Sequence, residues 1–100
     1  MDNTITIVNG DYGVTINMNI INGTPSIEDS FLITIKDTNN QTLITKEYTG
    51  VTNTIPFSLT QEESELLQPI LHYYSVDWYK DGVFWKNIVN GAKFLVKKKV

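Results

Sequence analysis

The C-terminal stretch of the chain decides its fold; from His72 to Val100 it reads HYYSVDWYKDGVFWKNIVNGAKFLVKKKV. It contains two dipeptides, Asp81-Gly82 and Asn90-Gly91, that favour type I′ hairpin turns, because both central positions of such a turn have positive φ. Valine, isoleucine and aromatic residues, which favour strands, lie on both sides of each dipeptide. The stretch therefore predicts three antiparallel strands joined by two tight turns.

The register of these strands predicts which face enters a core. A two-residue turn at Asp81-Gly82 pairs Trp78 with Trp85. The predicted core face then holds Tyr74, Val76, Trp78, Val83, Trp85, Val89, Phe94 and Val96. A three-residue bulged turn beginning at Lys80 would shift the register and exchange the faces of the later strands. The two-residue turn is favoured because it places both tryptophans together and inside.

The opposite face of the same strands is predicted to bind a partner. It combines aromatic and aliphatic side chains with lysines and Asp77, and a contiguous apolar patch of this kind is typical of interfaces. Asp77 and Lys86 would form an opposite-charge pair across two strands. The predicted partner-binding residues are Tyr73, Tyr79, Phe84, Lys86, Ile88, Lys93 and Leu95.

The rest of the chain alternates apolar and polar residues, as expected for strands with one dry and one wet face. Strands are predicted at 4–8, 14–20, 31–35, 42–48 and 53–58. Thr60-Gln61-Glu62-Glu63 is a capping box, which predicts a short helix over 60–68 that Pro69 ends. The core is expected to include Val14, Ile16, Met18, Ile20, Phe31, Ile33, Ile35, Trp78, Trp85, Phe94 and Val96.

Composition favours one globular β domain over residues 1–100. Hydrophobic residues make up 41% and charged residues 19% of the chain, which excludes disorder, and 100 residues suffice for a single core. Twelve isoleucines, twelve threonines and one alanine favour strands over helices. The expected fold is an antiparallel, immunoglobulin-like β-sandwich of about seven strands with one short helix.

Hydropathy and charge bear on location and partners. No segment approaches the roughly 18 apolar residues of a membrane span, and residues 1–4 lack the features of a secretory signal, so synthesis in the cytoplasm is expected. Residues 1–79 carry two lysines and ten acidic groups (−8), whereas residues 80–100 carry six lysines and one aspartate (+5). The basic run Lys97–Lys99 is interpreted as a solvated strand end, because nucleic-acid binding needs a wider basic face.

Residue patterns of catalysis and metal binding are missing from the sequence. His72 is the only histidine, and Ser75 would point to the opposite face of its strand, which rules out a Ser/His/Asp arrangement. Zinc would lack ligands because the chain has no cysteine. Asp11 and Glu28-Asp29 lie in no loop with alternating oxygen ligands for calcium. We expect no enzymatic activity, no metal and no cofactor.

The order of several segments resembles small immunoglobulin-like modules of tailed-phage virions, found in baseplate upper proteins and in tail or capsid accessory proteins. The segments that carry the resemblance are Gly10-Asp11, Asn22–Pro25, Phe57–Glu63, Tyr73–Asp77 and Gly91–Val96. Where those modules usually have glycine before the Tyr-rich strand, this chain has Pro69-Ile70-Leu71-His72. The resemblance implies a non-enzymatic structural protein of the virion that contacts capsid or tail proteins, or copies of itself.

A carbohydrate-binding β-sandwich module is the alternative function. The chain has eleven aromatic residues, and sugar sites use exposed rings beside planar polar side chains. The favoured register buries Trp78 and Trp85, which leaves Tyr73, Tyr79 and Phe84 as the outward rings of the C-terminal strands. A core role for the tryptophans therefore favours the assembly function.

Overall fold

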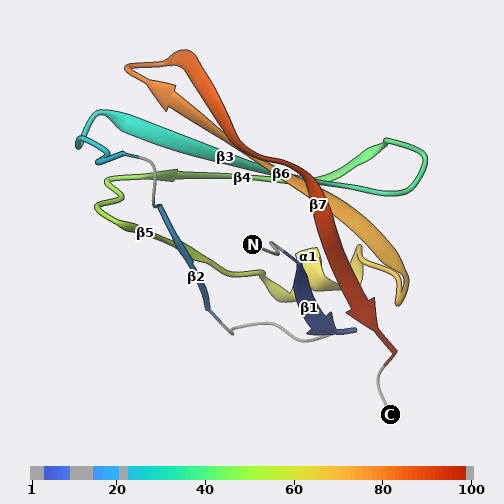
Figure 1. The fold of residues 1–100 in the computed structure, drawn as a ribbon. Helices are drawn as coiled ribbons and strands as arrows, with labels where there is room; N and C mark the ends of the chain where they lie inside the picture. The colour runs from blue at the N-terminus through green and yellow to red at the C-terminus, as the bar shows by residue number, and fades with distance from the viewer. Residues whose placement is uncertain (1–3, 10–14, 21–22, 99–100) are drawn as a thin grey trace.

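The computed structural model describes residues 4–9, 15–20 and 23–98, in which the chain forms seven strands and one short helix. The larger sheet has five strands in the order β1 (Ile5–Val8), β7 (Val83–Lys97), β6 (Leu71–Lys80), β3 (Asp29–Lys36) and β4 (Thr42–Thr49). The smaller sheet pairs β2 (Ile16–Asn19) with β5 (Thr54–Phe57). Figure 1 shows the smaller sheet against one face of the larger one, with α1 (Gln61–Glu65) near β1.

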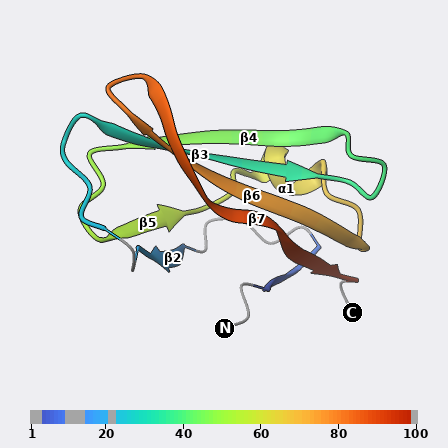
Figure 2. The ribbon, with the colours of Figure 1, turned by 45° about the horizontal axis from the view of Figure 1, so that its top comes forward.

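The hydrophobic core comes from residues of both sheets, which Figure 2 shows as two layers. Along β3 and β6 every second side chain is buried, which is the period of a strand with one face in the core. Phe57 of β5 contacts Phe94 of β7 edge-to-face, with ring centroids 6.2 Å apart. The buried hydrophobic residues are Ile5, Phe31, Ile33, Ile35, Ile44, Val51, Ile55, Phe57, Leu59, Leu67, Tyr74, Val76, Trp78, Phe94 and Val96.

The capping box predicted at Thr60 is confirmed. The Thr60 hydroxyl accepts a hydrogen bond from Glu63 N–H at 3.1 Å, and the Glu63 carboxylate accepts one from Thr60 N–H at 2.8 Å. The same carboxylate pairs with Lys46 of β4 at 2.9 Å. Burial opposes ionisation of Glu63, but these bonds and Lys46 outweigh it and hold the pKa of Glu63 below its usual value. The helix is thereby tied to the edge strand of the larger sheet.

The larger sheet is mixed, so the prediction of a purely antiparallel sandwich is wrong. β1 pairs in parallel with the last part of β7, from Ile5 opposite Phe94 to Val8 opposite Lys97. The other pairings are antiparallel among the residues that the structure describes. β1 and β7 are the first and last strands of the chain, so no hairpin joins them. Without a hairpin nothing requires the two strands to run antiparallel, and parallel pairing is possible.

The predicted turn at Asp81-Gly82 is confirmed, whereas the one at Asn90-Gly91 is wrong. Asp81 and Gly82 have φ of 50° and 79°, as a type I′ turn requires, and Lys80 faces Val83. At Asn90-Gly91 the chain does not reverse; β7 continues as one strand of 15 residues. Gly91 has φ of 69° and its N–H donates to the Ser75 hydroxyl, which is the geometry of a bulge formed around a glycine.

Bulges along β7 explain the errors in the predicted core face. Ten residues of β6 (71–80) pair with thirteen of β7 (83–95), and the three extra residues coincide with three shifts of register. One shift leaves Trp85 without a direct partner, so Trp78 faces Lys86, and Trp85 is 46% exposed. Val83, also placed in the core, is exposed at the end of the hairpin.

The remaining core predictions divide into three groups. Phe31, Ile33, Ile35, Trp78, Phe94 and Val96 are buried, as expected. Ile16, Met18 and Ile20 pack on the core but are half-buried, because the smaller sheet has an open side at β2. Val14, with the Gly10-Asp11 segment, lies outside the described residues.

Candidate interaction surfaces

Five of the seven predicted partner-binding residues lie on the outer face of the larger sheet. Tyr73 and Tyr79 alternate with the buried residues of β6, and each faces a β7 residue that shares its side. Tyr73 is opposite Lys93, Tyr79 is opposite Phe84, and Leu95 is opposite Leu71. The outer face therefore has two separate apolar ends, one at Tyr73 and Leu95 and one at Tyr79 and Phe84.

Lys86 and Ile88 do not lie on that face, and their assignment to it is wrong. The bulge at Trp85 moves Lys86 opposite the buried Trp78, and its ammonium lies 5.2 Å from the Trp78 ring centroid. Ile88 occupies a second bulge and lines a cavity on the inner side. The predicted pair of Asp77 with Lys86 is replaced by Asp77 with Asn87, whose amide donates to the carboxylate at 2.7 Å.

The turn between β6 and β7 carries a cluster of two tryptophans and two lysines. The rings of Trp78 and Trp85 meet edge-to-face with centroids 4.7 Å apart. The ammonium groups of Lys80 and Lys86 each lie 4.3 Å from the Trp85 ring centroid, within range of a cation–π interaction. These contacts hold Trp85 in place although it is partly exposed.

Asp29 anchors this cluster to β3. Its carboxylate accepts a hydrogen bond from Trp78 Nε1–H at 2.9 Å and two from Ser26, and it lies 3.6 Å from the Lys80 ammonium. Burial opposes ionisation, but the bonds from Ser26 and Trp78 and the charge of Lys80 outweigh it, so the pKa of Asp29 lies below its usual value. The carboxylate is thus a structural acceptor with its partners in place.

Trp85 of this cluster is one of four large apolar side chains that are exposed at the same end of the larger sheet. Ile27, Val83, Phe84 and Trp85 are 84%, 68%, 54% and 46% exposed, and we call these four residues the apolar tip. Ile27 precedes β3 at the end where Asp29 pairs with Lys80, so it lies at the same end of the sheet as the hairpin. Exposed apolar groups gathered in this way are typical of a contact surface.

The outer face between its two apolar ends is polar and hollowed. A hollow of about 430 Å³ is lined by Leu32, Thr34, Lys36, Thr42, Thr45, Ser75, Asp77, Asn87 and Asn90. A neighbouring hollow of about 270 Å³ shares Lys36, Ser75 and Asn90 and extends to Tyr73. This surface offers amides, hydroxyls and one ring, which are groups that bind polar ligands.

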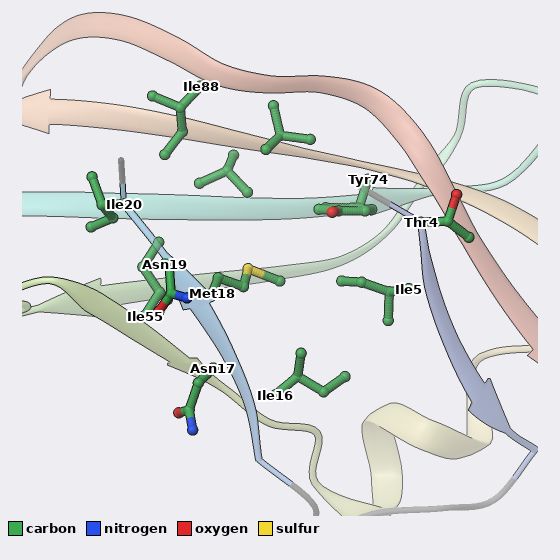
Figure 3. A pocket seen from close by; sticks show the side chains of 12 residues that line it. Thr4, Ile5, Ile16, Asn17, Met18, Asn19, Ile20, Ile55, Tyr74 and Ile88 are labelled. Atoms are coloured by element: carbon green, nitrogen blue, oxygen red, sulfur yellow. The ribbon is translucent and has the colours of Figure 1, made fainter. Parts of the chain in front are cut away.

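A cavity lined by apolar and uncharged polar residues opens between the sheets on the side of β2 (Figure 3). Its volume is about 220 Å³, and it is lined by Thr4, Ile5, Ile16, Asn17, Met18, Asn19, Ile20, Ile55, Tyr74, Val76, Ile88 and Val89. The lining carries no charged side chain. In Figure 3 the labelled Ile5, Ile16, Met18 and Ile88 project into the space between β2 and the larger sheet.

His72 lies in the core. Its ring is buried, Nε2 lies 3.0 Å from the Gln68 carbonyl oxygen, and Nδ1 has no hydrogen-bond partner. Ser75 and Asp77 alternate with it onto the outer face. Within residues 4–9, 15–20 and 23–98 no three histidine, cysteine or carboxylate side chains are close enough to bind a metal. In the same ranges no helix is long and apolar enough to cross a membrane.

The sequence indicated part of the apolar tip. The sequence pattern places Phe84 on the outer face and Val83 and Trp85 on the core face. It predicts no position for Ile27. The signal available was the position of Val83, Phe84 and Trp85 directly after a two-residue turn, where strand pairing has no further neighbours to cover them. No family model matches the chain, and a search of curated proteins finds no match.

Proposed function

We propose that this protein is a non-enzymatic structural component of a tailed-phage virion, acting as a capsid accessory protein or a tail or baseplate module. The observation that carries the proposal is the apolar tip, a group of exposed apolar side chains in which Trp85 is held by Trp78 and Lys80 and Phe84 packs against Tyr79. A rigid, exposed apolar group is suited to fill a pocket on another protein. The partner is another virion protein, and the location is the particle.

We further propose that the strands correspond to those of an immunoglobulin-like domain, which would support this function. Such domains place strands G, F, C and C′ in one sheet and strands B and E in the other. In the order in which they lie side by side, β7, β6, β3 and β4 would correspond to the first set, and β2 and β5 to the second. The order of segments in the sequence, from the Thr60–Glu63 capping box to the Tyr-rich strand, is similar to that of phage virion modules.

Fractionation of purified phage particles tests this function. Particles are disrupted into heads and tails, and the protein is located in the fractions with an antibody. We expect it to remain with one of the two fractions and to dissociate under conditions that weaken apolar contacts. Absence of the protein from particles that carry all other structural proteins would refute the proposal.

A carbohydrate-binding module is a second candidate, favoured by two observations. Trp85 is exposed instead of buried, and the polar hollow on the outer face is bordered by Tyr73. Titration with soluble oligosaccharides distinguishes the candidates: a tryptophan emission change that saturates, and that Trp85→Ala removes, supports glycan binding. An unchanged emission spectrum at millimolar sugar supports assembly.

A further inference from the structure

Among the described residues, one edge of β2 has no strand beside it. Among the described residues β2 pairs with β5 alone, and Ile20 N–H donates to the Asn53 carbonyl at 2.8 Å. In an antiparallel strand the residues that hydrogen-bond to one neighbouring strand recur at every second position. The backbone N–H and C=O groups of Ile16 and Met18 therefore point to β5, like those of Ile20. The N–H and C=O groups of Asn17 and Asn19 therefore point to the free edge.

Three other free edges carry features that discourage strand addition, as exposed edges in natural proteins usually do. β4 has the charged Lys46 on its inner side, paired with Glu63. β5 has Pro56 opposite Asn17, in a position where its missing N–H faces the free edge. The part of β7 beyond β1 is distorted by bulges.

β1 and β2 lack such features, and both border the cavity between the sheets. Ile16, Met18 and Ile20 are half-buried there, so each leaves apolar surface uncovered next to an open edge. A strand added to β2 would hydrogen-bond to the edge and place its own inward side chains over the cavity. This is the geometry of β-augmentation.

The sequence of β2 indicates what that strand is. Residues 16–20 read Ile-Asn-Met-Asn-Ile, which is the same in both directions. We propose that β2 pairs antiparallel with β2 of a second copy, centred on Met18, and joins the two smaller sheets across a two-fold axis. The interface is isologous, as in most protein dimers: Asn17 faces Asn19 of the second copy, Ile16 faces its Ile20, and Met18 faces its Met18.

This register satisfies three requirements at once. Asn17 and Asn19 exchange both backbone bonds with their opposites, which gives four hydrogen bonds from the groups that point to the free edge. The apolar side chains of both copies lie on the same side, over the cavities. No charged residue lines the cavity, so its lining brings no like charges to the two-fold axis although the chain has net charge −3. A shift by one residue would place Asn opposite Met. The four backbone hydrogen bonds and the shared apolar side would then both be lost.

Self-pairing through β2 leaves the apolar tip free, so the dimer can dock on a virion partner through that surface. The pairing depends on the β2 edge alone and not on the proposed function. The purified chain tests the pairing, whereas isolated particles test the function. Each can fail without the other.

Cysteine cross-linking gives a direct test, because the chain has no cysteine. Met18 and its copy form a non-hydrogen-bonded pair with Cα atoms about 4.5 Å apart, within the range of about 4.4–6.8 Å that a disulfide spans. We expect Met18→Cys to form a covalent dimer under mild oxidation. Thr49→Cys, on the free edge of β4, is the matched control and is expected to stay monomeric. Equal cross-linking of the two variants would overturn the proposal.

Charge substitutions on the exposed side of β2 test the register. Asn17→Lys with Asn19→Lys sets like charges opposite each other twice, and we expect sedimentation equilibrium to show the dimer weakened about tenfold. Asn17→Lys with Asn19→Glu sets opposite charges together and is expected to restore the dimer. Thermal unfolding checks that both variants fold; if either does not, the cysteine variant decides. A native chain that is monomeric at about 1 mM, or a dimer unaffected by the first pair, would refute the pairing.

Discussion

Trp78 lies where the core meets the apolar tip. Its ring is fully buried, packs against Phe31 with centroids 5.0 Å apart, and meets Trp85 on another side. Gly23 also approaches it so closely that a Cβ there would lie 3.0 Å from the ring. The Trp78 ring is therefore closely packed on several sides, and its removal would leave a cavity.

Truncation of this ring is expected to be costly. Trp78→Ala removes a buried aromatic side chain and leaves a cavity, so we expect the free energy of unfolding to fall by about 3–5 kcal/mol. Trp85→Ala is the control, with an expected loss of about 1 kcal/mol because its ring is partly exposed. Urea denaturation measures both. A cost below about 1 kcal/mol for Trp78→Ala would mean that the core is arranged differently.

Asp29 makes stability depend on pH through the same cluster. Its folded pKa is lower than its reference value of 3.8, so the ionised carboxylate stabilises the fold. This contribution is complete above the unfolded pKa and is lost as the pH falls through the folded pKa. We expect native stability, measured by urea denaturation from pH 7 to pH 2, to decline below about pH 4.

Asp29→Asn, which keeps an acceptor for Trp78 Nε1–H, should decline less over that range. Some decline must remain, because the pKa of Glu63 is also lowered. Parallel curves for the native chain and this variant would show that Asp29 has the same pKa folded and unfolded.

Local residue patterns predicted the buried alternation of β3 and the Thr60 cap because both depend on neighbours within a few positions. Trp85 could not be assigned in the same way. Its exposure follows from a bulge that depends on pairing with β6 at long range. The same limit applies to Lys86 and Ile88, which the sequence placed on the wrong face.

Among the strands and the helix, β7 differs most from its predicted form, because bulges change which of its side chains face outward. Asn90-Gly91 is suited to a hairpin turn and to a bulge alike, since both need a residue with positive φ. The structure uses it as a bulge because β7 pairs with the same strand, β6, on both sides of Gly91, from Val83 to Leu95. Sequence alone could not decide between these outcomes, because the choice depends on which strand β7 pairs with.

Gly91 is therefore expected to be sensitive to substitution although nothing crowds it. A Cβ at Gly91 would meet no atom within 4 Å, so any cost comes from its φ of 69°. We expect Gly91→Ala to lower the free energy of unfolding by about 1–2 kcal/mol. Gly91→Asn should cost less, because asparagine tolerates this conformation better. Equal costs for both variants in urea denaturation would indicate that packing, and not backbone conformation, is responsible.

For the whole molecule, the sequence indicated seven strands and one helix in a single β domain but not the parallel pairing of β1 with β7. Short strands such as β1 carry no signal for the strand that they will join, because the choice depends on which edge remains free after the rest has folded. The open side of β2 is a consequence of that choice. With β1 in the larger sheet, no described strand covers β2 in the smaller one.

The role of the apolar tip in assembly can be tested against a control, Leu66, which is an exposed apolar residue at the C-terminal end of α1. Val83→Ser with Phe84→Ser removes two exposed side chains from the tip, and we expect the free energy of unfolding to fall by about 1–2 kcal/mol, mainly because Phe84 loses its edge-to-face contact with Tyr79. Incorporation of the variant into phage particles should be lost, since the contact that desolvates these side chains no longer forms. Leu66→Ser, at a residue 57% exposed beside α1, is the control and should be incorporated normally. Quantitative immunoblots of purified particles measure both. Normal incorporation of the folded tip variant would show that the virion contact lies elsewhere on the molecule.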